Sequence, residues 1–372
     1  MNAKVSIVKC KDYEPGRVLE ATRRAVDLIG GISSFIRPKS RVLVKPNLLM
    51  AIEPESAVDT HPEVVRAAIK ILKDINCVIY VGDGPSAFGS EAENIDEVHR
   101  RSGMKKICEE EDVELVKFDK RRWRGKFPLS TWPDDCDYVL NLPKLKTHNF
   151  MLMTAAIKNL FGLVSGTFKT ELHKKYFPPH EFARIVVDIY EKVNPALTII
   201  DSVLTMEGDG PGSSGEPRNT GLILAGSDCV ALDTVSALIM GLNPFDVLIT
   251  KEASIRGLGV SDINSISIVG QRLDSVIGEP FKLPATSMVR KIPRPVIEIV
   301  KKFIRYYPHV KHDNCTRCLA CVEACPSKVI SLEKNRITIK YAKCIACFCC
   351  QEVCPSAAIK VRKSILAKMI GL

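Results

Sequence analysis

Cysteines near the C-terminus have the residue type and spacing of metal ligands. The chain has 14 cysteines, and nine of them fall between Cys315 and Cys354. Clustered thiols in a chain long enough to bury its own core indicate metal binding rather than disulfides. Two runs share the spacing Cys-x2-Cys-x2-Cys-x3-Cys-Pro, with cysteines at Cys315, Cys318, Cys321 and Cys325 and again at Cys344, Cys347, Cys350 and Cys354.

The two runs form an internal repeat with an offset of 29 residues. Pro326-Ser327 after the first run recurs as Pro355-Ser356 after the second. Between the runs, residues 329–332 and 336–339 have the pattern of two short strands. Zinc sites usually pair two separated Cys-x2-Cys knuckles and rarely use a third cysteine at the same spacing, which favours iron–sulfur clusters here.

These runs resemble those of the bacterial two-cluster ferredoxins over residues 312–361. In that family the fourth cysteine of each run ligates the other cluster, and the clusters transfer single electrons, commonly at low potential. Cys349 is an extra thiol, expected beside a cluster rather than on it. The resemblance implies two [4Fe–4S] clusters, one held by Cys315, Cys318, Cys321 and Cys354 and the other by Cys344, Cys347, Cys350 and Cys325.

The first 280 residues alternate short apolar runs with helical periodicity, which predicts an α/β fold with a largely parallel layered sheet. A helix is expected over residues 18–29, and a second one begins near Thr60, which we take as its N-cap. The expected strands are residues 5–8, 42–44, 78–81, 113–118, 138–140, 197–200, 222–224 and 267–269.

Polar residues follow several of these strands. Open α/β sheets bind ligands beyond the carboxyl ends of their strands, so these residues are expected to line one cleft. The glycine-rich segment 208–215 lacks the endings of phosphate-binding and dinucleotide motifs; it is interpreted as an anion-binding nest or a plain mobile loop. The candidate cleft residues are Lys45, Asn47, Asp83, Lys144, Lys146, His148, Lys158, Asn159, Glu207 and Asp209.

The residue types predict an anionic ligand. Lysines and amides bind carboxylates or phosphates, and a histidine can transfer the proton that accompanies an electron. A solvated lysine face is the alternative, and residues 173–180 are a candidate lid. We assign catalytic roles to Lys146, His148, Lys45 and Asp83, and ligand-binding roles to Asn47, Lys144, Lys158, Asn159, Glu207 and Asp209.

Several of these segments resemble a known family. Residues 45–49, 60–65, 142–148, 157–162 and 206–211 are similar to the family called domain of unknown function 362, across about residues 3–270. Its members often carry a C-terminal ferredoxin pair and have no settled activity. The resemblance therefore implies the architecture and leaves the reaction open.

Charge and hydropathy define the remaining organisation. The net charge of +10 is concentrated in residues 281–312, which we interpret as a basic linker with a short amphipathic helix. This linker would join an α/β domain (1–280) to a ferredoxin-like α+β domain with a basic tail (313–372). Such local basicity is not a nucleic-acid-binding composition. No apolar run is long enough to span a membrane, so we expect a cytoplasmic protein, with peripheral contact to anionic lipid as an alternative.

The preferred hypothesis is an oxidoreductase that passes low-potential electrons through two clusters to a small anionic substrate or cofactor in the cleft. An external protein would serve as electron donor or acceptor. The alternative is a non-catalytic ferredoxin-type carrier, or a maturation factor that binds a partner protein. In a third interpretation the clusters are structural, and the first domain is a non-redox enzyme.

Overall fold

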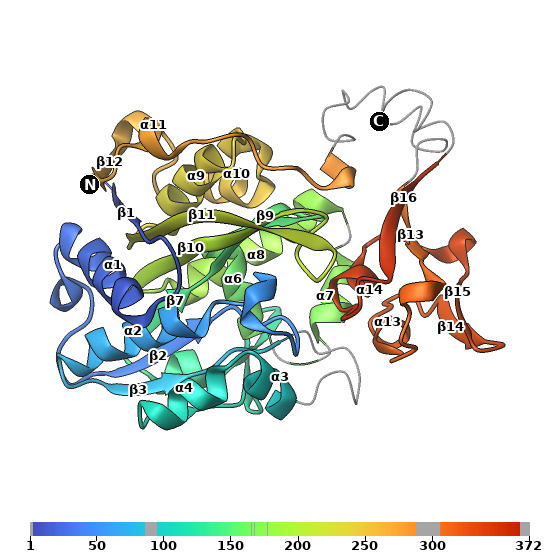
Figure 1. Cartoon of the computed structure of the whole chain (residues 1–372), viewed down its shortest axis with the longest axis horizontal. Helices are drawn as coiled ribbons and strands as arrows, with labels where there is room; N and C mark the ends of the chain where they lie inside the picture. Colours follow the sequence, from blue (N-terminus) through green and yellow to red (C-terminus); the bar gives the residue numbers. More distant parts are fainter. Residues whose placement is uncertain are drawn as a thin grey trace.

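The computed structural model describes residues 3–85, 95–164, 166, 168–176, 178–287 and 306–364. A ten-stranded sheet forms the centre of the larger part, and the smaller C-terminal part lies beside it (Figure 1). The strands of the large sheet are β1 (Ala3–Lys9), β2 (Arg41–Pro46), β3 (Val78–Val81), β4 (Glu114–Leu115), β7 (Tyr138–Leu142), β8 (Lys144–His148), β9 (Leu152–Thr154), β10 (Leu197–Gly208), β11 (Gly215–Gly226) and β12 (Ile266–Gly270).

The large sheet is mostly parallel. Its order is β12-β1-β11-β10-β7-β2-β3-β4, with β8 and β9 attached beside β10. Pairs β1–β12, β10–β7, β7–β2, β2–β3 and β3–β4 are parallel, whereas β11 runs antiparallel to both of its neighbours. The expected largely parallel α/β fold is confirmed, and each of the eight expected strands is present in whole or in part.

Helices cover both faces of the sheet because side chains along each strand alternate between two apolar clusters. The longer helices are α1 (Pro15–Leu28), α2 (Pro62–Lys73), α3 (Ile95–Arg101), α4 (Met104–Glu110), α7 (Phe168–Lys175), α8 (Pro179–Val193), α9 (Cys229–Ile239) and α10 (Leu248–Ile255); single turns are α5 (Trp132–Asp135), α6 (Ala156–Asn159) and α11 (Leu273–Val276). Leu43 joins the cluster under α6, α8, α9 and α10, whereas Val42 and Val44 join the cluster under α1, α2 and α4.

Three local predictions differ from the structure. Helix α2 is capped by the Nδ1 atom of His61, because the Thr60 hydroxyl is instead bonded to the Leu142 carbonyl. Residues 144–148, expected as a loop, form β8 between β10 and β9. The sequence patterns also gave no sign of the separate hairpin of β5 (Arg121–Arg124) and β6 (Phe127–Ser130).

The C-terminal part has its own small cores and two short two-stranded antiparallel sheets. These are β13 (Tyr306–Val310) with β16 (Ile359–Lys363), and β14 (Ile330–Glu333) with β15 (Arg336–Ile339); β14 and β15 confirm the two expected strands. The single-turn helices α13 (Ala320–Glu323) and α14 (Cys349–Glu352) follow the two cysteine loops.

The 29-residue repeat extends to backbone conformation. Positive φ angles occur at Arg317, Leu319 and Lys328, and again 29 residues later at Ala346, Phe348 and Ala357. A non-glycine residue adopts this conformation infrequently, so three matched pairs show that both cysteine loops take the same shape. The repeat is therefore a structural duplication.

The described ends of the expected linker 281–312 are packed against the rest of the protein. Phe281 is buried in the apolar cluster under α9, and Thr286 donates a hydrogen bond to the carbonyl of Asn149. At the other end, β13 pairs with β16, so Tyr307 lies in a strand rather than in the expected helix. The rest of that helix, over residues 296–304, lies outside the described residues.

Candidate functional site: a cationic cavity closed by a cysteine-bearing helix

The candidate site lies where the direction of the sheet's connections reverses. From β2 the chain continues to β3 on one side, whereas from its neighbour β7 it continues to β10 on the other. Crevices at such a switch point, beyond the carboxyl ends of the strands, are the usual ligand sites of open α/β sheets. The paired ends Lys45–Asn141 and Pro46–Leu142 define this edge.

A small cavity of about 70 Å³ opens at this edge. Six of the predicted residues line it, drawn from the ends of β2 and β3, from β8 and from α6. Three lysines and two histidines among its walls face two carboxylates, so basic groups outnumber acidic ones at the site. The lining residues are Asn47, Leu48, Leu49, Asp83, Gly84, Lys146, His148, Thr154, Lys158, Asn159, Phe161, Gly162, Lys169, His173, Pro211 and Glu352.

Lys45 and Asp83 form a buried ion pair at the base of the cavity. Lys45 Nζ lies 2.7 Å from Asp83 Oδ1, and both side chains are at most 1% exposed. The other carboxylate oxygen accepts a hydrogen bond from the backbone of Leu48, at 2.8 Å, which fixes the loop after β2. Burial lowers the pKa of Lys45, and the Asp83 carboxylate opposes that shift. Lys45 is therefore already paired and is not part of the cavity lining.

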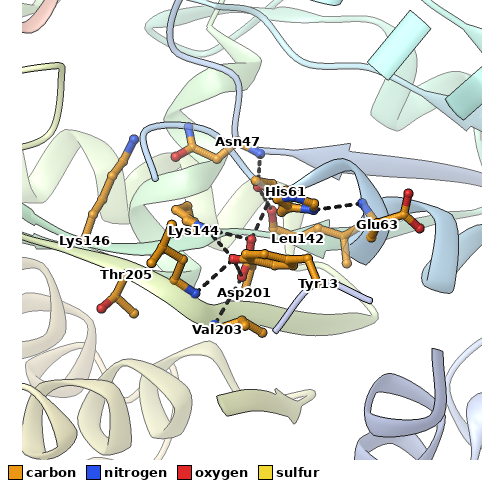
Figure 2. Close-up of polar contacts among 12 residues, drawn as sticks. Tyr13, Asn47, His61, Glu63, Leu142, Lys144, Lys146, Asp201, Val203 and Thr205 are labelled. Atoms are coloured by element: carbon orange, nitrogen blue, oxygen red, sulfur yellow. Dashed lines mark hydrogen bonds and ion pairs between the residues drawn. The ribbon is translucent and has the colours of Figure 1, made fainter. Parts of the chain in front are cut away.

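Lys144 is held in a separate buried network around Asp201 (Figure 2). Its Nζ donates to Asp201 Oδ2 at 2.9 Å and to the Tyr13 hydroxyl at 2.8 Å, and that hydroxyl donates to Asp201 Oδ1 at 2.7 Å. The Tyr13 ring stacks on His61, with ring centroids 3.5 Å apart, and the His61 backbone N–H donates to Asp201. This network ties the segment before α1 to the start of α2, and Lys144 does not reach the cavity.

Lys146 does line the cavity and shares its buried surroundings with Asp59. Alternation along β8 points Lys146 and His148 to the same side of the strand. Lys146 Nζ donates to the Val58 carbonyl oxygen. Burial lowers the pKa of Lys146 to about 7 and raises that of Asp59 to about 7, and each charge opposes the shift of the other. The other charges that act on Lys146 are those of Lys158, Lys144 and Glu352.

His148 is positioned as a hydrogen-bond donor. Its Nδ1 accepts hydrogen bonds from the backbone N–H groups of Phe150 at 3.1 Å and Met151 at 3.3 Å. A ring that accepts at Nδ1 is neutral and carries its proton on Nε2, which lies 3.4 Å from Glu352 Oε1. The proton transfer predicted for His148 would require Nδ1 to lose these bonds, so the geometry supports donation from Nε2 instead.

Helix α6 presents Lys158 and Asn159 side by side. Its first turn is fixed by Asp233 of α9, whose carboxylate accepts the backbone N–H groups of Ala156 at 2.7 Å and Ile157 at 3.4 Å. Burial lowers the pKa of Lys158, and the Glu352 carboxylate opposes that shift. Within the described residues, Lys158 has no ion pair or side-chain hydrogen bond, so only the more distant Glu352 carboxylate acts on its charge.

The cysteine-bearing helix α14 closes the cavity. Glu352, which follows Cys350 by two residues and precedes Cys354 by two, is part of the lining. Burial raises the pKa of Glu352 to about 7, and Lys158 and Lys146 oppose that shift. Gln351 beside it accepts a hydrogen bond from Asn149 at 2.7 Å. The α/β part and the ferredoxin-like part thus meet at this cavity.

The hairpin tip between β10 and β11 forms the rest of this junction. Ser213 Oγ donates to the Cys354 carbonyl and Ser214 Oγ donates to the Ile359 carbonyl at 3.2 Å. Gln351 Nε2 donates to the Asp209 carbonyl at 3.3 Å. The glycine-rich segment, interpreted from sequence as a nest or a mobile loop, therefore binds the C-terminal part through hydrogen bonds.

Two further predicted residues, Glu207 and Asp209, also lie outside the cavity. Glu207 pairs with Arg218 at 2.9 Å and with Lys282 at 3.4 Å, and Asp209 Oδ1 accepts the backbone N–H of Ala285 at 2.9 Å. Both carboxylates fix residues 282–285 against the hairpin of β10 and β11. Glu207 and Asp209 are close in sequence to the cavity residue Pro211, but they do not line the cavity.

The eight cysteines of the two runs surround two pockets. Residues from both runs line each pocket, because the fourth cysteine of each run reaches the pocket of the other, as the ferredoxin resemblance implies. Hydrogen bonds from backbone N–H groups reach three of the sulfurs, as is usual for cluster ligands. One pocket contains Cys325, Cys344, Cys347 and Cys350, and the other contains Cys315, Cys318, Cys321 and Cys354.

The four-cysteine pockets fit an iron–sulfur cluster. Each pocket surrounds a volume with sulfur from several directions, and thiolates are the ligands of such clusters. Within the described chain, no three His, Cys, Asp or Glu side chains converge on a point suited to a single metal ion. Cys349, the extra thiol, is fully buried and donates a hydrogen bond to Cys347.

Several cavity residues escaped the sequence reasoning. Glu352 and Lys169 come from segments distant in sequence from the strand ends, and no local pattern marks them. His173, noted only as part of a lid, lies buried among Phe150, Phe161 and Phe182. Burial lowers the pKa of His173 to about 3, so the ring is neutral at physiological pH.

The fold and the cysteine pockets define an iron–sulfur electron-transfer protein. The sequence model described as a 4Fe-4S dicluster domain matches residues 308–355. The chain belongs to the family described as Domain of unknown function (DUF362), whose model matches residues 42–238. Both resemblances drawn from the sequence are confirmed.

A relative of the chain has a recorded association. The chain is 35% identical, over 247 residues, to the thylakoid-associated protein sll1697 of Synechocystis sp. (strain ATCC 27184 / PCC 6803 / Kazusa). The match covers 64% of this chain and 75% of that protein. Among the described residues of the present chain, no helix is long and apolar enough to cross a membrane.

Proposed function

We propose that the protein is an oxidoreductase that delivers electrons from two [4Fe–4S] clusters to a small anion bound in the cationic cavity. One observation carries the proposal. Helix α14 supplies Cys350 to one cluster pocket and also supplies Glu352 to the cavity wall. An electron-transfer centre and a ligand site that share one turn of helix are positioned to exchange electrons.

The grouping of the cysteines supports the ligand sets. One cluster would be held by Cys315, Cys318, Cys321 and Cys354 and the other by Cys325, Cys344, Cys347 and Cys350, as the two pockets group them. Bound clusters would each supply one electron at a time. The two pockets and the dicluster name of the matching domain support a count of two.

Burial suggests the direction of electron flow. Cys318 is exposed, whereas Cys350 is buried beside the cavity junction. The pocket that contains Cys318 therefore offers the accessible side, where an external low-potential donor protein would dock. The pocket that contains Cys347 and Cys350 is on the cavity side, because Cys350 and the cavity residue Glu352 belong to the same turn of α14.

The cavity residues would bind the ligand and supply a proton. Lys158 would balance the charge of the anion, and the His148 Nε2–H would donate a hydrogen bond. Reduction of a double bond of the ligand by two electrons takes up two protons. Lys146, whose pKa burial lowers to about 7, can release one of them to the ligand and regain it from solvent. The second proton would come from solvent, and the external donor protein would supply the electrons.

A reoxidation assay tests this function. The holoprotein is reduced anaerobically, mixed with candidate small anions, and cluster reoxidation is followed by visible absorbance and electron paramagnetic resonance. Lys158→Met should slow reoxidation at least tenfold with the cluster signals intact. Lys192→Met, on the exposed surface of α8, serves as the matched control and should react as the native protein does.

Two results would contradict the proposal. Reoxidation of the Lys158→Met protein at the native rate would show that the cavity does not receive the electrons. Copurification of a stoichiometric partner protein that reoxidises the clusters, with no response to any small anion, would favour the carrier or maturation-factor alternative.

We further propose that the protein acts in the cytoplasm. The thylakoid association of the relative makes peripheral membrane contact the alternative. Fractionation of cells at low and high salt distinguishes them. Recovery in the membrane fraction only at low salt would indicate peripheral attachment and would contradict the cytoplasmic assignment.

A further inference from the structure

The cavity offers hydrogen-bond acceptors as well as positive charge. Asn159 is 3% exposed, and its Oδ1 has no hydrogen-bond partner among the described residues. The Oδ1 of Asn47 is also without a partner there, and both residues line the cavity. A buried acceptor without a donor is costly, so native proteins seldom retain one unless a ligand or water satisfies it.

A chain of hydrogen bonds fixes which end of the Asn159 amide faces the cavity. The Asn141 Nδ2 donates to the Ala156 carbonyl at 3.0 Å, and a carbonyl oxygen can only accept. Asn141 must therefore accept with its Oδ1, and it does so from Asn159 Nδ2 at 2.8 Å. This leaves the Oδ1 of Asn159 as the free end, so the acceptor at the cavity is a consequence of the network.

The acceptor and a cation without a direct partner among the described residues are adjacent on one rigid element. Lys158 and Asn159 are consecutive residues of α6, and Asp233 anchors the start of that helix. A ligand with negative charge alone would satisfy Lys158 and leave the amide oxygen unpaired. A ligand with donors alone would leave the ammonium unpaired. Only a molecule that carries both groups satisfies the two together.

We propose that the cavity binds a small oxyanion that also carries an O–H or N–H group, such as a 2-hydroxycarboxylate or a protonated phosphate. The anionic oxygens lie against Lys158, an O–H or N–H hydrogen donates to the Oδ1 of Asn159, and a second hydrogen or a bridging water reaches the Oδ1 of Asn47. The proposal rests on the proposed function only in assigning the ligand to this cavity. It names the chemical class that the cavity selects.

Matched pairs of anions test the selection. Binding to the holoprotein with oxidised clusters, without any electron donor, is measured by titration calorimetry for glycolate against acetate and for phosphate against sulfate at pH 6. Glycolate and phosphate carry an O–H group that acetate and sulfate lack. A site that hydrogen-bonds an O–H group discriminates strongly against an analogue without it, so at least tenfold tighter binding is expected in one pair. The pair that shows it identifies the oxyanion as carboxylate or phosphate.

Variants separate the two contributions. Asn159→Leu and Asn47→Ala should each reduce the discrimination within the selected pair, whereas Lys158→Met should weaken both of its members equally. Asn47 is half-buried, and its Oδ1 accepts no hydrogen bond from the described residues. The Asn47→Ala variant therefore tests the acceptor even if Asn159→Leu fails to fold.

Three outcomes would overturn the ligand class: no binding of any of the four anions, equal affinity within both pairs, or unchanged discrimination in both asparagine variants. These outcomes are distinguishable from failure of the proposed function. Selective binding of an O–H anion, with no reducible anion of the same class able to reoxidise the reduced clusters, would remove the oxidoreductase assignment and leave the ligand class intact. Reoxidation by anions that lack the O–H group would do the reverse.

Discussion

A single methyl group at Gly212 should separate the C-terminal part from the cavity. Gly212 is at the tip of the β10–β11 hairpin, and a Cβ atom there would overlap the Glu352 carbonyl oxygen and lie 3.1 Å from its carbon. Both contacts are with backbone, so no side chain can rotate away. Helix α14 must withdraw by roughly 1 Å to restore an ordinary contact distance. Gly212→Ala should therefore push α14 away from the tip of the β10–β11 hairpin.

The expected energy follows from packing and hydrogen bonds. Inserting a methyl group into a packed contact costs about 1–3 kcal/mol. Withdrawal also weakens the hydrogen bonds of Ser213 and Ser214 to the C-terminal part, each worth about 1 kcal/mol. A net loss of about 2 kcal/mol shifts the ratio of docked to undocked protein by up to roughly 30-fold.

Hydrogen–deuterium exchange measures this shift. Peptides that cover α14 and the hairpin tip should exchange up to roughly 30-fold faster in Gly212→Ala, while the core strand β2 is unchanged. Gly278→Ala is the control, because a Cβ there meets nothing closer than 4.0 Å. Native exchange rates in α14 together with native ligand affinity would refute the inference that this contact holds the cavity closed.

Three further predictions concern the cavity and the clusters. Gly162→Ala would place a methyl group against the Asp83 carboxylate and separate the buried ion pair of Asp83 with Lys45. The melting temperature should therefore fall by several degrees, whereas that of the Gly278→Ala control should not change. Cys349→Ala removes a hydrogen bond to Cys347, so a potentiometric titration should show a lower reduction potential for the cluster on that cysteine; an unchanged value would contradict the donor role. Because burial lowers the pKa of Lys146 to about 7, its ammonium is lost as the pH rises, and anion affinity should fall about tenfold between pH 6 and 8, with a flatter profile in Lys146→Met.

The sequence predicted those features that depend on local pattern. The cysteine spacing identified both runs, because cluster ligation requires closely spaced thiolates whatever the rest of the fold does. The strand ends were found because carboxyl ends of parallel strands meet at one edge, which brought Asn47 and Asp83 to the cavity.

Features that depend on long-range pairing could not be predicted. Lys45 and Lys144 carry the same charge as Lys158, yet buried carboxylates at Asp83 and Asp201 neutralise the first two and not the third. The sequence also gave no indication that Glu352 would reach the cavity, because that contact depends on how the C-terminal part docks. The role of a lysine in this site is set by its partner, which lies far away in the chain.

The shared helix α14 implies that ligand binding and cluster potential are linked. Reduction adds negative charge near Glu352, on the wall of the cavity, and so should weaken the binding of an anion there. By thermodynamic reciprocity the same anion must lower the reduction potential of the cluster. If reduction weakens anion binding tenfold, saturating anion lowers the potential by about 59 mV for one electron. A potentiometric titration with and without the selected anion measures the shift, and Lys158→Met should abolish it. An unchanged or raised reduction potential at saturating anion would contradict the expected coupling between anion binding and cluster reduction.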